Sequence, residues 1–165
     1  MIWLRHLFNF YIDSSIHVAL AVYALTYVTL TSFGFIYSEP ILYTNFYATI
    51  IGYNFVKLYP LIQQKVLLSV YHKVILFFSF LCSLGLLYYL VQLNIIRIIL
   101  LTILGIVSFL YCVPFYKLET LRSYPRFKIF IIALVWASSC LILPFFAFNE
   151  VFNTDALLTF IQYVV

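Results

Sequence analysis

The stretch Gly52-Tyr53-Asn54-Phe55-Val56-Lys57 stands where the second long apolar run of the chain meets its first lysines. Asn54 and Lys57 are three residues apart, so on a helix they share one face. If the apolar runs are membrane helices, the Asn54 amide lies just inside the hydrocarbon and the Lys57 ammonium lies at its rim. The stretch therefore predicts the end of a membrane helix that offers a place for an anionic headgroup.

The composition of the whole chain also predicts a membrane protein. Of the 165 residues, 66% are hydrophobic and 8% are charged, and the mean hydropathy is +1.11, whereas soluble domains are only about half apolar. About 20 apolar helical residues cross a hydrocarbon core. We therefore expect an all-α integral membrane protein with a bundle of five transmembrane helices, because runs such as Val74 to Tyr89 lack the alternation of a transmembrane barrel. The expected spans are residues 14–37, 41–57, 74–93, 98–116 and 129–148.

Two further segments complete the single membrane domain that the sequence predicts. Residues 1–12 carry Trp3, Leu7 and Phe10 at spacings of three and four, which is typical of an interfacial helix. The apolar run at 156–165 is too short to span a bilayer. We therefore expect it to be a partial span or an interfacial end.

The basic residues predict the orientation of the bundle. They lie between the expected spans rather than on a soluble face, so we do not expect a nucleic-acid partner. Cations gather on the cytoplasmic side of membrane proteins, which places the N-terminus, the second connection and the fourth connection in the cytoplasm. The cations on this side are Arg5, Lys57, Lys65, Lys73, Lys117, Arg122, Arg126 and Lys128.

The fourth connection, residues 117–128, holds four cations against the single carboxylate Glu119. One interpretation is orientation by charge together with attraction to anionic lipid. The other is a phosphate or diphosphate clamp, in which Lys117 and Arg122 bind an anionic headgroup. For Asn54, the alternative to a headgroup is a hydrogen bond to a neighbouring helix.

Three segments, taken in order, resemble the UbiA-type intramembrane prenyltransferases, particularly their divergent bacterial members. They are SIHVAL at 15–20 followed by YAL at 23–25, TIIGYNFVK at 49–57, and the run from Tyr111 through Pro114, Lys117, Leu121-Arg122 and Pro125 to KIFIIALVWA at 128–137. The resemblance covers about residues 12–145, which correspond to the front half of a family member. It implies a helical bundle around a cavity open to lipid, in the bacterial inner (plasma) membrane.

The resemblance also shows where this chain departs from the family. In the family, Mg²⁺ held by two Asp-rich motifs binds a prenyl diphosphate, and the first motif, NDxxDxxxD, ends the second span. Asn54 matches the Asn of that motif, whereas the three Asp positions hold Phe55, Leu58 and Ile62. The hard oxygen ligands that Mg²⁺ prefers are therefore missing from this motif.

The same comparison matches Tyr111 and Lys117 to an aromatic and a basic residue that lie near the diphosphate in the family. The sequence thus predicts a UbiA-like membrane protein, degenerate or truncated, that binds an isoprenoid or a lipid phosphate but performs no prenyl transfer by itself. We expect no catalytic residue, metal ligand or cofactor in this chain. The candidate substrate-binding residues are Asn54, Lys57, Tyr111, Lys117 and Arg122.

Two other functions stay open at this point. The chain could be an active prenyltransferase when a missing C-terminal half or a partner supplies the carboxylates. It could instead be a structural or transport subunit of a membrane complex, within a homo- or hetero-oligomer. A midplane charge or a broken helix would favour transport, and the sequence shows neither in its expected spans.

Overall fold

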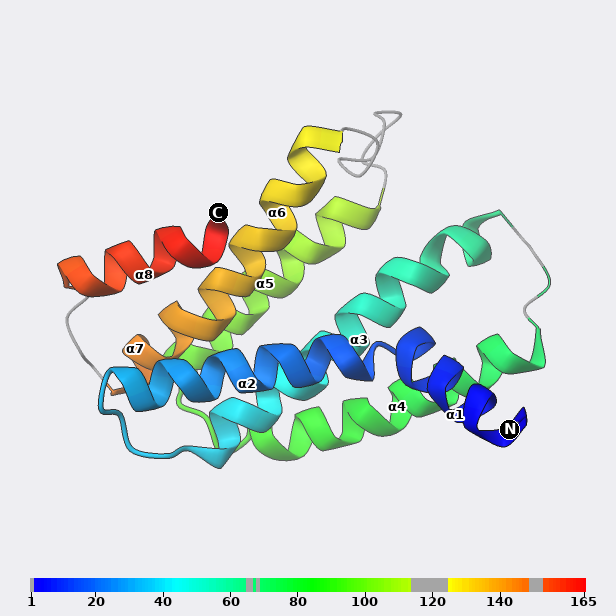
Figure 1. Cartoon of the computed structure of the whole chain (residues 1–165), viewed down its shortest axis with the longest axis horizontal. Helices are drawn as coiled ribbons and strands as arrows, with labels where there is room; N and C mark the ends of the chain where they lie inside the picture. Colours follow the sequence, from blue (N-terminus) through cyan, green and yellow to red (C-terminus); the bar gives the residue numbers. More distant parts are fainter. Residues whose placement is uncertain (1, 65–66, 68, 114–124, 149–152) are drawn as a thin grey trace.

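The computed structural model describes residues 2–64, 67, 69–113, 125–148 and 153–165. Over these ranges the chain is helical and contains no strand, which confirms the prediction of an all-α protein. Figure 1 shows the arrangement of the helices. They are α1 (Ile2–Asp13), α2 (Ile16–Ser32), α3 (Glu39–Gln63), α4 (Val70–Leu90), α5 (Ile95–Cys112), α6 (Pro125–Ala137), the π-helical turn η2 (Ser138–Ile142), α7 (Leu143–Phe148) and α8 (Thr154–Val164).

The helices α1 and α2 meet at a corner with a bend of 57°. Ser15, at this corner, is buried and has a φ of 63°, a left-handed conformation that is uncommon outside glycine. At its other end, α2 stops at Ser32, which is earlier than the predicted span 14–37. The reason is Gly34, whose φ of 69° ends the helix, while the Phe35 amide donates to the Leu30 carbonyl at 2.8 Å.

The central helix is α3, which packs most extensively against α2 and α4. The sequence predicted a membrane span over residues 41–57, and the helix in the structure is longer than this range. The helix continues to Gln63 with Pro60 inside it. Continuation keeps Leu58 buried and places Ile62 opposite α4, so packing outweighs the loss of one backbone hydrogen bond at the proline.

The helices α4 and α5 lie within a few residues of the predicted spans 74–93 and 98–116. Ser69 caps α4, and Asn94 caps α5 by accepting a hydrogen bond from the Arg97 amide at 3.1 Å. After Cys112, Val113 is extended, with φ −91° and ψ 128°. A residue that precedes a proline is restricted in this way; Pro114 itself lies outside the described residues.

Residues 129–148, predicted as the fifth span, fall in three consecutive helical elements, α6, η2 and α7. In a π turn the amide of residue i bonds the carbonyl of residue i−5, and Leu143 donates to Ser138 in this way. The next such pair would join Pro144 to Ser139, but proline has no N–H. The side chain of Asn45 supplies the missing donor, with Nδ2 at 2.8 Å from the Ser139 carbonyl oxygen.

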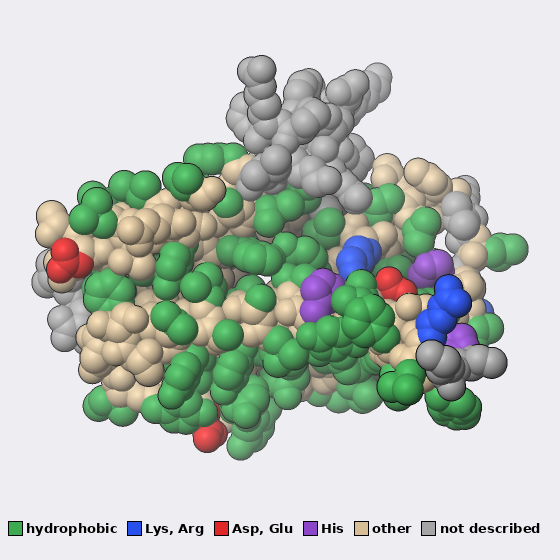
Figure 2. Space-filling view, in the orientation of Figure 1, with side chains coloured by type: hydrophobic (Ala, Val, Ile, Leu, Met, Phe, Trp, Pro, Cys, Tyr) green, Lys and Arg blue, Asp and Glu red, His purple; other side chains and the backbone are tan. Residues whose placement is uncertain are grey.

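Among the described residues, one helix, α4, is long and apolar enough to cross a membrane by itself. Residues Trp3–Asp13 and Ile16–Ser32 pass the same criterion only as a bent pair, and the apolar helices Ile95–Tyr111 and Phe130–Phe146 are shorter. Only 11% of the most apolar window of α4 is buried, whereas the core helix of a soluble protein is mostly buried. Figure 2 shows hydrophobic side chains over much of the surface. Crossing by all five predicted spans stays a prediction.

The helices α3 and α4 approach each other closely at Gly85. A Cβ placed on Gly85 would lie 2.9 Å from the ring of Tyr47. That ring is held by its neighbours: the Tyr43 and Tyr89 rings stack on each other at 5.0 Å, and each also stacks against Tyr47. The tyrosine cluster therefore fixes the surface on which Gly85 packs.

Replacing Gly85 by alanine is expected to lower the free energy of unfolding by about 1 kcal/mol. Overpacking typically costs about 1–3 kcal/mol, which exceeds the gain of about 1 kcal/mol from alanine over glycine in a helix. Denaturation in detergent micelles, followed by circular dichroism, measures the change. The matched control is Gly105→Ala, where a Cβ meets nothing within 4 Å, and we expect it to stabilise the protein. Equal destabilisation by both variants would contradict the packing explanation.

Candidate functional site

A cavity of about 470 Å³ lies between α3, α5 and α6, next to the C-terminal part of α4. This volume falls within the range of about 300–1,000 Å³ that is usual for small-molecule sites. No described residue that lines it is charged. Two glycines open the walls, because a Cβ on Gly52 of α3 or on Gly105 of α5 would meet nothing within 4 Å. The apolar lining includes Leu86, Leu90, Ile98, Leu101, Ile131 and Val135.

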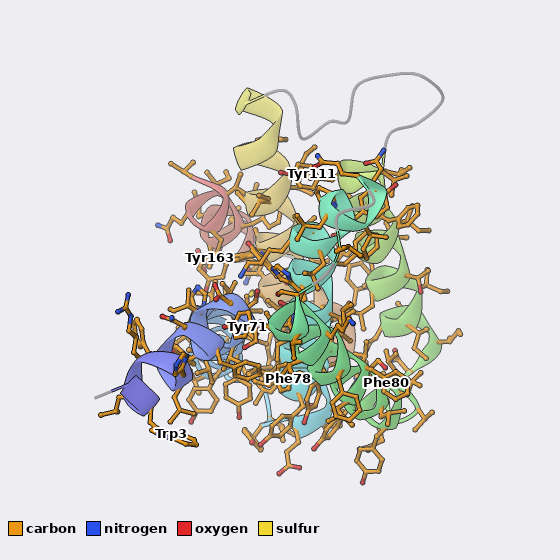
Figure 3. All side chains as sticks on the ribbon, turned by 90° about the vertical axis from the view of Figure 1, so that its right-hand side faces the viewer. Trp3, Tyr71, Phe78, Phe80, Tyr111 and Tyr163 are labelled. Carbon is orange, nitrogen blue, oxygen red and sulfur yellow. The ribbon has the colours of Figure 1, made fainter. Side chains whose placement is uncertain are left out.

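Three aromatic residues with polar groups line the same cavity from three helices. They are Tyr53 of α3, Tyr111 of α5 and Trp136 of α6. The rings of Tyr53 and Trp136 are 5.8 Å apart. Figure 3 shows Tyr111 near the C-terminal end of α5, far from Trp3 on α1. Such side chains suit a ligand that is apolar along one part and polar at another.

Asn54 takes part in a buried network that links three helices. The Ser15 hydroxyl donates to Asn54 Oδ1 at 3.0 Å, and Asn54 Nδ2 donates to Ser79 Oγ at 2.8 Å. The side chain is 1% exposed. It faces a smaller cavity of about 240 Å³ between α3 and α4, not the larger one. Of the two interpretations of Asn54, the structure shows the hydrogen bond to neighbouring helices.

Lys57 lies at the corner between α1 and α2. Its Nζ donates to the carbonyl oxygens of Ile12 at 3.2 Å and Asp13 at 3.1 Å. These carbonyls end α1, where a cation is favoured by the helix dipole. The Tyr71 hydroxyl donates to Asp13 Oδ2 at 2.9 Å and adds α4 to the same corner. Lys57 does not line the larger cavity.

Of the five predicted site residues, only Tyr111 is shown to line the larger cavity. Lys117 and Arg122 lie outside the described residues. The sequence reasoning missed Tyr53, Trp136 and Gly105, since nothing in an apolar run distinguishes them from other aromatic or small residues. Asn45 also lines the cavity, and it could have been singled out from the sequence. An amide side chain within an apolar run must find polar partners.

Metal-ligating side chains do not gather in the part of the chain that the structure describes. No group of three or more His, Cys, Asp or Glu residues there could hold a metal ion. Cys82 and Cys140 are buried free thiols. Cys82 packs with Ala19 and Ile50.

Comparisons of the chain with protein-family models, with curated proteins and with solved structures find no match in any of the three. The resemblance to the UbiA-type prenyltransferases therefore depends only on the sequence segments described above. The cavity and its lining are the geometry on which a functional proposal can be built.

Proposed function

We propose that this chain is an integral membrane protein of five spans, similar to the front half of the UbiA-type prenyltransferases, that binds an isoprenoid or a lipid phosphate. The observation that carries the proposal is the cavity of about 470 Å³ between α3, α5 and α6, whose described lining is uncharged. An apolar chain fits such a lining because its transfer from water or headgroup surroundings is favourable. No prenyl transfer is expected from the chain by itself, since carboxylates are missing from the family's first Asp-rich motif.

The surface supports placement in a membrane. Large apolar side chains are exposed on α1, α2, α4, α5 and α8 as well as at both cavities. In Figure 2 the visible Lys, Arg and His side chains lie in the right-hand part of the molecule, over α1 and its corner with α2, while acidic groups also lie toward the left and lower edges. In Figure 1 the corner of α1 with α2, the C-terminal end of α3 and the N-terminal end of α4 lie to the right. The turns that follow α2 and α4 lie to the left. This alternation suits helices that cross in turn, with the N-terminus in the cytoplasm.

The lining also suggests how a ligand would lie. The apolar part would extend along Leu90 and Ile98, and the polar part would lie toward Tyr53 and Tyr111. In the sequence, the cationic connection that contains Lys117 follows α5 within a few residues. A phosphate beyond the polar end of the cavity would meet these cations.

Filling the cavity tests the proposal. Gly105→Leu adds a side chain where the wall is open, and we expect it to weaken binding of geranylgeranyl phosphate about 10-fold or more, a loss of about 1.4 kcal/mol. Binding is measured on the full chain in detergent micelles by native mass spectrometry. Ile103→Phe is the matched control, because Ile103 is exposed on α5 and does not line the cavity.

The headgroup part of the proposal has its own arm in the same experiment. Lys117→Ala is expected to weaken the binding of geranylgeranyl phosphate and to leave the binding of the corresponding alcohol unchanged. Only the phosphate group needs a cation. If neither probe binds to the parent protein, or if Gly105→Leu and Ile103→Phe behave alike, the cavity is not the binding site and the proposal fails. A structural or transport subunit would then remain as the alternative.

A further inference from the structure

We infer that the ligand of this chain is a lipid phosphate with two apolar chains, and that its second chain lies in the smaller cavity between α3 and α4. This inference rests on the proposed function, because it concerns the ligand of the larger cavity. It depends on a different observation, namely the position of the smaller cavity, which has no role in the proposed function.

The two cavities share a wall on α3. Ile51 and Phe55 line both of them. The ring of Phe55 stacks against Phe109 of α5 with centroids 5.8 Å apart, and Phe109 lines the larger cavity only. The smaller cavity, of about 240 Å³, instead continues along α4. The Phe55 side chain therefore lies between two neighbouring apolar spaces.

One side of α4 runs along both cavities. The residues of α4 that line them recur at spacings of three and four, so they share one side of the helix. Figure 3 shows Phe80 on the side of α4 toward α5. Figure 1 shows that α4 and α5 diverge from the turn that joins them. In order along α4, the residues at the smaller cavity are Leu76, Ser79, Phe80 and Ser83, and those at the larger cavity are Leu86 and Leu90.

Both cavities reach the same end of the bundle. Ile62, which lines the smaller cavity, is one residue before the end of α3, and Tyr111, which lines the larger one, is one residue before the end of α5. The helices α3 and α5 run in the same direction, because α4 returns between them in the chain (Figure 1). The proposed function places the phosphate at this end. From there a lipid can extend one chain into each cavity, on the two sides of Phe55.

The smaller cavity suits a hydrocarbon chain. No described residue that lines it is charged. Asn54 donates to Ser79, and the hydroxyls of Ser79 and Ser83 donate to carbonyl oxygens of α4 itself at 2.8 and 2.6 Å. Tyr59, the remaining polar residue of the described lining, lies close to the end of α3, where the headgroup is expected. The deeper part of this cavity is therefore apolar, and an apolar chain fits it.

Two lipids that differ by one chain test the inference. Dioleoyl phosphatidic acid and oleoyl lysophosphatidic acid carry the same phosphate group, and native mass spectrometry of the full chain in detergent micelles gives the ratio of their affinities. Ser83→Phe fills the smaller cavity. We expect the preference for the two-chain lipid to fall about 5-fold or more, because the second chain then loses many small van der Waals contacts. Binding of the one-chain lipid should be unchanged, since its chain occupies the larger cavity. Comparing the ratio between variants cancels the different solubilities of the two lipids in the micelle.

Leu84→Phe is the matched control, because Leu84 neighbours Ser83 on α4, is 50% exposed and lines neither cavity. It should leave the ratio unchanged. A ratio that Ser83→Phe does not change, or that both variants lower alike, overturns this inference and leaves the proposed function standing. Binding of geranylgeranyl phosphate without binding of dioleoyl phosphatidic acid has the same meaning. If none of the three lipids binds to the parent protein, the proposed function itself fails.

Discussion

Replacing Asn45 by alanine is expected to lower the free energy of unfolding by about 3 kcal/mol. The change removes hydrogen bonds to Thr26 and to the Ser139 carbonyl. The second loss is the larger one, because a buried carbonyl without a donor costs about 1–3 kcal/mol, and truncation of a fully buried side chain leaves a cavity as well. Denaturation in detergent micelles, followed by circular dichroism, measures the effect.

The role of Pro144 makes this prediction sharper. If Asn45 replaces the donor that Pro144 lacks, then Pro144→Ala restores a backbone N–H for the carbonyl at Ser139. In the Pro144→Ala background, Asn45→Ala should lower the free energy of unfolding by less than it does in the parent protein. A double-mutant cycle should show a difference of about 1 kcal/mol or more. Additive costs would contradict the link between the amide and the π turn. Asn9→Ala, an exposed amide on α1, is the control for a general effect of removing an asparagine.

Asn54→Ala is expected to lower the free energy of unfolding by about 2 kcal/mol. It breaks the bonds to Ser15 of the α1–α2 corner and to Ser79 of α4. Bonds between membrane helices are worth about 0.6 kcal/mol on average and at most about 1.7 kcal/mol, and the vacated volume adds to the loss. The measurement is the same denaturation experiment on ligand-free protein.

This second prediction also separates two roles for Asn54. A residue that only binds a headgroup would leave the stability of the ligand-free protein unchanged. A residue that joins helices lowers it, and Ser79→Ala should then show coupling with Asn54→Ala of about 1 kcal/mol. No destabilisation, or no coupling, would favour the headgroup interpretation that the sequence first suggested.

The helices themselves could be predicted from the sequence because apolar runs and charges separate them clearly. Several helix boundaries could not be predicted from the sequence. The end of α2 depends on the left-handed Gly34, and the continuation of α3 past Lys57 depends on the burial of Leu58 against its neighbours. The π turn depends on a side chain of α3 that donates to Ser139, and no local pattern in residues 138–142 shows this.

The candidate site was predictable only in part. Spacing alone placed Asn54 and Lys57 on one face of a helix, and in the structure both indeed support the α1–α2 corner. Spacing could not say which neighbour that face meets. Tyr111 was assigned through the resemblance, and it lines the larger cavity. Its companions Tyr53 and Trp136 come from other helices, and their proximity depends on how α3, α5 and α6 pack.

The sequence by itself determined the class of this protein. Its apolar composition and the charges between the runs specify helices with large apolar surfaces, because a helix satisfies its own backbone in an apolar medium. Only the tertiary structure decided what the stretch from Gly52 to Lys57 does. Side-chain partners come from contacts between distant segments, so packing put Asn54 and Lys57 at a corner between helices and Gly52 and Tyr53 in the wall of a cavity.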